Sequence, residues 1–332
     1  MAGGQERALK RRIKSVQSTK KITKAMELIS ASRIAKAQER VAAARPYSER
    51  ITGVIRNLAA AGAAGDSPLL NPREEITTVA YVVVAADRGL AGGYNSSVIR
   101  NAERRMAADK EAGRQTALVT VGKKATGYFR FRGYEIDANF SGFSDAPSYE
   151  DAREVASHVA AKFESGEYSE VHLAYTQFFS VGSQTSTVVQ YMPLDSSAME
   201  EAETTGPSAD YEFEPEPSEI LERLLPRYAE ARLYAAFLEA AASEHAARQR
   251  AMKSATENAE DMIVRLGRVM NRARQDAITT EIMEIVSGAE ALRAAASSGS
   301  DLLVDKVNVE DIFNKTHIHP HRSEHFSAGE QS

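Results

Sequence analysis

Apolar and small residues recur at steps of three and four along the last third of the chain, the spacing of one face of an α-helix. No proline and only two glycines interrupt residues 227–292. The pattern predicts one helix of 66 residues, which at 1.5 Å per residue would be roughly 100 Å long. Such a helix exceeds any compact domain of this size, so we expect much of it to project and to pair with another helix. Its apolar row includes Leu224, Tyr228, Ala231, Ala235, Leu238, Met252, Ala259, Met262, Leu266, Val269, Ile278, Ile282, Ile285 and Leu292.

The first segment of the chain has a similar periodicity and is the expected partner. Leu9, Ile13 and Val16 fall at helical spacing, and an alanine-rich stretch over 31–44 permits close approach of another helix. Pro46 is expected to kink or interrupt this helix, which then continues to residue 61. Two long terminal helices separated by about 150 residues predict an antiparallel coiled coil that emerges from a globular body.

The middle of the chain alternates between strand-like and helix-like segments. This order predicts a Rossmann-like α/β domain with a mixed sheet, parallel except for an antiparallel edge formed by the last two strands. The expected strands cover 76–86, 116–121, 134–140, 171–178 and 185–192, and the expected helices cover 96–110, 123–131 and 149–164.

These patterns divide the chain into five expected parts. They are an N-terminal coiled-coil helix (1–61), an α/β domain (74–194), an acidic loop insertion (195–219), a C-terminal coiled-coil helix (220–293) and a flexible C-terminal tail (294–332).

Charge is strongly segregated along the chain, although the net charge is only −5. Residues 1–56 carry fourteen Lys or Arg against four Glu, whereas residues 195–219 hold nine acids and no base. A basic helix can contact nucleic acid, anionic lipid or an acidic protein surface, or can simply present a solvated face. The absence of cysteine excludes disulfides, thiolate zinc sites and a cysteine nucleophile. No apolar run approaches the roughly 20 residues that cross a bilayer.

Two segments are candidates for ligand chemistry, and both have a simpler explanation. Residues 87–95 follow the first predicted strand and open a helix, as a phosphate-binding loop would, but match neither GxGxxG nor a P-loop. A tight turn that requires glycine is favoured there. His317, His319, His321 and His325 could bind a metal, although a mobile tail with adventitious affinity is favoured. We therefore assign no catalytic residue, no cofactor and no metal site.

Three segments resemble the gamma subunit of F-type ATP synthases, and together they span about residues 5–292. The agreement of several motifs in the same order is more specific than any single motif. The second segment departs from the family at Ala91, where a cysteine is usual. The segments are 21–33, 87–95, and a C-terminal set at 243–248, 251–253, 255–259, 273–275, 278–281, 284 and 288–291.

The resemblance implies a non-catalytic rotor that couples proton-driven rotation of the c-ring to conformational change in the catalytic beta subunits. The terminal helices would enter a ring of three alpha and three beta subunits, and the α/β domain would meet epsilon and the c-ring. The protein would be peripheral, held through the complex at the cytoplasmic face of the bacterial plasma membrane. Matching positions imply ring contacts at Lys24, Met26, Glu27, Arg248, Arg274, Gln275, Thr279 and Glu281.

Two features depart from the family pattern: an acidic insertion around 199–210 and a tail that continues for forty residues after Leu292. Two other functions stay open at this point. The basic first helix suits a coiled-coil scaffold or nucleic-acid binder, although residues 1–46 contain no aromatic side chain for base stacking. A nucleotide-dependent enzyme would use residues 87–95.

Overall fold

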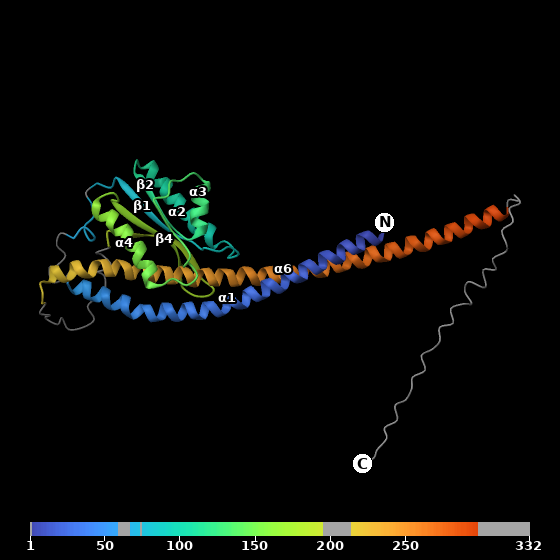
Figure 1. The fold of residues 1–332 in the computed structure, drawn as a ribbon, viewed down its shortest axis with the longest axis horizontal. Coiled ribbons are helices and arrows are strands. Elements are labelled where there is room, and N and C mark those ends of the chain that lie inside the picture. Colours follow the sequence, from blue (N-terminus) through green and yellow to red (C-terminus); the bar gives the residue numbers. More distant parts are fainter. Residues whose placement is uncertain (1, 59–66, 74, 195–213, 298–332) are drawn as a thin grey trace, which may run out of the picture. The chain divides into compact units, whose positions relative to one another are not determined.

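A computed structural model describes residues 2–58, 67–73, 75–194 and 214–297 (Figure 1). The chain forms two compact units. The larger unit runs from Ala8 to Arg268, and the smaller one joins the chain up to Arg7 with the chain from Val269 onward. Most of the expected acidic loop and of the C-terminal tail lies outside the described residues, including the four histidines of the tail.

Two long helices begin and end the described chain: α1 (Ala2–Leu58, 57 residues) and α6 (Pro217–Ser297, 81 residues). Of the two outcomes expected at Pro46, the interruption is wrong, because α1 continues through this residue, whereas the kink stays a prediction. A proline removes one helical hydrogen bond, but Ile55 and Leu58 beyond it are buried in the core and hold the last turns in place. Helix α6 begins at Pro217, where a proline in the first turn costs no hydrogen bond, so the last residues of the predicted acidic loop belong to the helix.

Within the larger unit, α1 and α6 pair in antiparallel fashion, as predicted. The hydroxyl oxygens of Thr23 and Thr256 lie 2.8 Å apart, and Lys20 Nζ lies 2.8 Å from a carboxylate oxygen of Glu260. Rising numbers on α1 therefore face falling numbers on α6. The Thr23 and Thr256 side chains are both buried, so their contact is a polar point in the helix interface that fixes the register.

We expect Thr23→Val to lower the free energy of unfolding by about 1 kcal/mol, because the buried hydroxyl of Thr256 loses a hydrogen-bond partner. Denaturant unfolding of the full chain measures this difference. Thr19→Val is the matched control: Thr19 lies one turn earlier on α1, is exposed, and bonds only the Ser15 carbonyl. Equal losses for the two variants would show that the Thr23–Thr256 contact contributes nothing specific.

The α/β domain contains one five-stranded sheet in the order β3-β2-β1-β4-β5. All neighbouring pairs are parallel except β4–β5, which is antiparallel, so the predicted mixed sheet is confirmed. The strands are β1 (Thr78–Val84), β2 (Gln115–Val121), β3 (Ala138–Phe140), β4 (Glu170–Phe178) and β5 (Gln184–Met192).

Strand β3 is shorter than the predicted 134–140. Tyr134 and Ile136 pack against the helices on one face of the sheet instead of extending the strand. The Tyr134 hydroxyl donates to Glu103 at 3.2 Å, and its ring meets Phe129 edge to face. Tertiary contacts of these side chains therefore override the strand-like sequence pattern.

Helices cover both faces of the sheet, and alternate residues of β1 show which helix lies where. Val79, Tyr81 and Val83 share a core with α2 (Tyr94–Glu111) and α3 (Lys123–Phe131). Val82 and Val84 face the other way, into a core built by α4 (Tyr149–Ser165) and α6.

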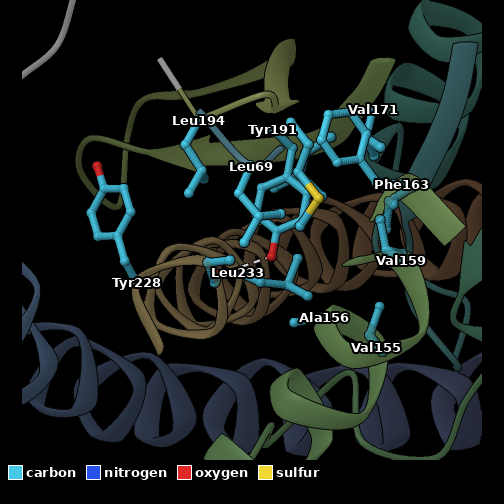
Figure 2. Packing of buried hydrophobic residues seen from close by; sticks show 14 of the residues in the cluster. Leu69, Val155, Ala156, Val159, Phe163, Val171, Tyr191, Leu194, Tyr228 and Leu233 are labelled. Atoms are coloured by element: carbon cyan, nitrogen blue, oxygen red, sulfur yellow. Dashed lines mark hydrogen bonds between the residues drawn. The ribbon is translucent and has the colours of Figure 1, made fainter. Parts of the chain in front are cut away.

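The second core joins the sheet to α6 directly. Figure 2 shows Val155, Val159 and Phe163 of α4 near Tyr191 of β5 and Leu233 of α6. The buried Tyr191 hydroxyl donates to the backbone carbonyl of Ala229 in α6 at 2.9 Å. Burial and this hydrogen bond together fix the sheet on the first half of α6.

Candidate functional site

The loop over 87–95 is a structural turn between β1 and α2. The Asp87 carboxylate accepts hydrogen bonds from the backbone N–H groups of Lys123, Gly142 and Ser144. Burial raises the pKa of Asp87, but these donors outweigh it and hold the pKa below its usual range. The Asp87 carboxylate therefore ties the start of the loop to the beginning of α3 and to the segment that follows β3.

Backbone angles support the same conclusion. Gly92 has φ of 57° and the non-glycine Leu90 has φ of 64°, so the loop uses the left-handed region twice. Asn95 closes the turn, because its side-chain oxygen accepts from the Ala86 N–H at 2.8 Å. The predicted tight turn that requires glycine is thus confirmed at Gly92.

Where α6 crosses this loop, it carries a buried ion pair. Arg248 Nη2 lies 2.6 Å from a carboxylate oxygen of Glu244, with side-chain exposures of 9% and 1%. The guanidinium also donates to the Gly89 carbonyl at 3.4 Å from two of its nitrogens. Burial raises the pKa of Glu244, and the Arg248 charge opposes that rise. Arg248 therefore holds α6 to the loop within this chain.

His245 adds a second polar contact on the neighbouring side of α6. Its Nε2 lies 3.0 Å from the backbone carbonyl of Asp145, which can only accept, so Nε2 carries the proton. Burial lowers the pKa of His245, and the charges of Arg248 and Arg33 act in the same direction. The imidazole is consequently neutral near pH 7, with a bare Nδ1.

The ring-contact residues predicted on α1 lie near the Thr23–Thr256 contact. Lys24 is exposed and pairs with Glu27 one turn away at 3.1 Å, whereas Met26 is half-buried. The Lys24 side chain is 54% exposed and that of Glu27 only 13%, so Lys24 is the member of this pair that faces solvent.

The predicted residues at the end of α6 are Arg274, Gln275, Thr279 and Glu281, and all four are exposed. They belong to the smaller unit, whereas Lys24, Met26, Glu27 and Arg248 belong to the larger one. The same stretch of α6 exposes large apolar side chains, which soluble proteins rarely leave contiguous without a partner. These are Ile278, Ile282, Met283, Ile285, Val286 and Leu292.

The polar group around Glu244 and His245 was not assigned from the sequence. Its signal was the spacing of Glu244 and Arg248, one helical turn apart within a run of buried alanines. Its other members, Asp87 and Asp145, lie far away in the chain and carry no local signal.

In the part of the chain that the structure describes, no group of three or more His, Asp or Glu side chains is placed to hold a metal. Among the same residues, no helix is both long and apolar enough to cross a bilayer.

Comparison with known proteins gives a concordant result. The ATP synthase family model matches residues 5–292. The gamma chain of ATP synthase from Frankia casuarinae is 53% identical over 293 residues, covering 87% of this chain and 98% of that relative. The gamma chain from Mycolicibacterium smegmatis is 47% identical over 300 residues, covering 86% and 97%.

Two solved structures with the same fold come from mitochondrial ATP synthases. A chain of the Euglena gracilis complex of OSCP, F1 and c-ring matches with a TM-score of 0.60 at 16% identity, covering 91% of this chain and 99% of that chain. A chain of the Tetrahymena thermophila central stalk and c-ring matches with a TM-score of 0.54 at 22% identity, covering 70% and 99%.

An α/β domain carried on an antiparallel helix pair is thus the fold that this chain shares with chains of ATP synthase complexes, and the matching family model is that of ATP synthase. The chain belongs to the ATP synthase gamma-chain family.

Proposed function

We propose that this chain is the non-catalytic rotor that couples proton-driven rotation of the c-ring to conformational change in the catalytic beta subunits. The observation that carries the proposal is the exposed apolar surface on the end of α6. Ile285 and Leu292 there are 67% and 75% exposed. Such side chains are stabilised only when a partner covers them.

The proposed partner of this surface is a ring of three alpha and three beta subunits. Contacts that slide must be numerous enough to guide the shaft and weak enough to exchange. A surface that mixes apolar side chains with Arg274, Gln275, Thr279 and Glu281 suits that requirement, because each exposed polar contact is worth little alone. On α1, Lys24, Met26 and Glu27 form the second proposed contact with the ring.

Asymmetry of the helix pair supplies the coupling. Two helices have no threefold symmetry, so they present a different face to each beta subunit and bias each toward a different nucleotide affinity. Arg248, for which the resemblance also implies a contact with the ring, takes a different part in this proposal. Its side chain is buried against Glu244, so it positions α6 on the α/β domain and transmits torque from within the subunit.

The remaining partners are proposed from the resemblance to the gamma subunit of F-type ATP synthases. We propose that the α/β domain meets epsilon and the c-ring, and that the complex holds this subunit at the cytoplasmic face of a bacterial plasma membrane. Recovery of the chain from membranes at one copy per three alpha and three beta subunits is the expected result. Consistent absence from that assembly would refute the proposal.

Cross-linking tests the ring contact directly, since the chain has no native cysteine. We expect Thr279→Cys, labelled with a photoreactive maleimide in the assembled complex, to form adducts with alpha or beta subunits. Rotation should then stop, with nearly complete loss of ATP hydrolysis on illumination. Mass spectrometry of the adducts and an ATPase assay measure the two results.

Phe131→Cys is the matched control, because Phe131 is 88% exposed at the end of α3 in the α/β domain. It should yield no adduct with alpha or beta. Equal yields of alpha or beta adducts from both positions, or none from Thr279→Cys, would contradict the proposed placement of α6.

A further inference from the structure

A basic cleft opens between α1, α6 and the loop that follows β3. Its volume is about 250 Å³. Arg33, Lys36 and Arg40 line it from α1, and His245 lines it from α6. Spacings of three and four residues place the three cations on one face of α1. The cleft is too small for a whole nucleotide but has room for a small anion.

Only one carboxylate among the lining residues opposes these cations. Asp145 lies 2.6 Å from Arg33 Nη1 and 3.9 Å from Arg88 Nη1. Lys36 and Arg40 have no ion pair among the described residues. The other acid close by on α6, Glu244, is already paired with Arg248. The cleft therefore holds a surplus of positive charge that nothing in the described chain neutralises.

His245 provides the second, independent observation. The residue is only 2% exposed, and its Nδ1 is buried with no hydrogen-bond partner among the described residues. Because Nε2 donates to the Asp145 carbonyl, a neutral ring leaves Nδ1 as an acceptor. A buried acceptor without a donor is costly, so a ligand that carries an O–H or N–H group would be stabilised by bonding to this nitrogen.

We propose that this cleft binds inorganic phosphate. Three acceptor oxygens of the anion meet Arg33, Lys36 and Arg40, and the remaining phosphate hydroxyl donates to His245 Nδ1. Inorganic phosphate combines both properties, because it keeps at least one hydroxyl near neutral pH. Sulfate has the same shape but no proton to donate. The site is separate from the proposed ring contacts and does not depend on them.

Calorimetric titration of the full chain with sodium phosphate, in a buffer free of other oxyanions, tests the proposal. We expect one site per chain, with sulfate bound at least about tenfold more weakly for want of one hydrogen bond. A phosphomonoester loses its last phosphate proton with a pKa of about 6, so at about pH 8 it should bind as weakly as sulfate. Equal affinity for the three anions, or no binding of phosphate, would overturn the proposal.

Variants locate the site. Lys36→Gln and Arg40→Gln should each weaken phosphate binding about tenfold, because each variant removes one charge-assisted hydrogen bond to the anion. Lys14→Gln, which removes an exposed cation farther along α1, should leave phosphate binding unchanged. Unchanged affinity in both cleft variants would refute the assignment.

Asp145→Asn provides a test with the opposite sign, which a merely destabilised fold would not reproduce. Removing the one opposing carboxylate frees Arg33, so phosphate binding should tighten about threefold or more. The His245 Nδ1 resonance in a nitrogen-15 spectrum should also shift on addition of phosphate and not of sulfate. Weaker binding by Asp145→Asn, or no shift, would show that the anion is held elsewhere.

Discussion

Arg248→Met lowers the free energy of unfolding by an expected 3–5 kcal/mol, roughly the effect of leaving a buried charge without its partner. Glu244, with a side chain only 1% exposed, loses the guanidinium that lies 2.6 Å away. One oxygen of its carboxylate already lacks a hydrogen-bond partner among the described residues. Denaturant unfolding of the full chain at neutral pH measures the loss.

The same variant has a pH dependence whose sign follows from Glu244. Burial raises the pKa of Glu244, and Arg248 lowers it, so removing Arg248 raises it further. A raised carboxyl pKa means that the folded state binds the proton more tightly than the unfolded state. The stabilisation that protonation of Glu244 gives to the folded state is present at low pH and is lost as pH rises through the pKa of the folded state. The deficit of Arg248→Met against wild type should therefore grow from acidic toward neutral pH.

Two comparisons isolate the pair. Arg250→Met changes an exposed arginine that contacts Val181 and Gln184, and it should cost less than about 1 kcal/mol. Adding Glu244→Gln to Arg248→Met should recover part of the loss, because no buried charge remains. If Arg248 served only as a contact to the ring, Arg248→Met would leave the isolated chain as stable as wild type.

Gly122→Ala has the second large expected effect, a loss of about 4 kcal/mol or more, which few single substitutions reach. Gly122 links β2 to α3 with φ of 95°, in the left-handed region, and its N–H donates to the Phe140 carbonyl at 2.7 Å. An added Cβ would fall far inside van der Waals contact of the Ala85 carbonyl at the end of β1. Since that obstacle is backbone, only a shift of the sheet could relieve it.

Gly127→Ala is the matched control for this prediction. Gly127 lies within α3 and has open space around the position of a Cβ. Replacing a glycine inside a helix should stabilise it by up to about 1 kcal/mol. Thermal unfolding and soluble yield of the two variants measure the contrast. A Gly122→Ala variant as stable as Gly127→Ala would mean that the β2–α3 turn tolerates a side chain.

The buried ion pair of Arg248 and Glu244 bears on how torque would pass through the subunit. Tyr191 and the apolar core hold the sheet to the first half of α6, and the pair of Arg248 with Glu244 holds the next part to the 87–95 loop. Several fixed points along one helix resist twisting better than one. In the proposed rotor, a weakened contact between Arg248 and Glu244 would reduce coupling without changing any contact with the ring of alpha and beta subunits.

The amino-acid sequence by itself determined the long helices and the order of strands. Periodicity is a local property, so helical spacing between Leu224 and Leu292 and the apolar strand pattern were sufficient. The same local rules failed at Tyr134 and in the expected interruption at Pro46, where burial of distant side chains decided the outcome.

Only the tertiary structure decided the surroundings of the polar residues. Sequence motifs could mark Arg248 and the 87–95 loop, but they could not show that the Arg248 side chain is buried against that loop. The same holds for the basic cleft, because Arg40 and His245 are separated by some two hundred residues and meet only when α1 and α6 pair. Electrostatic and hydrogen-bond partners depend on distance in space, which the linear order of residues does not record.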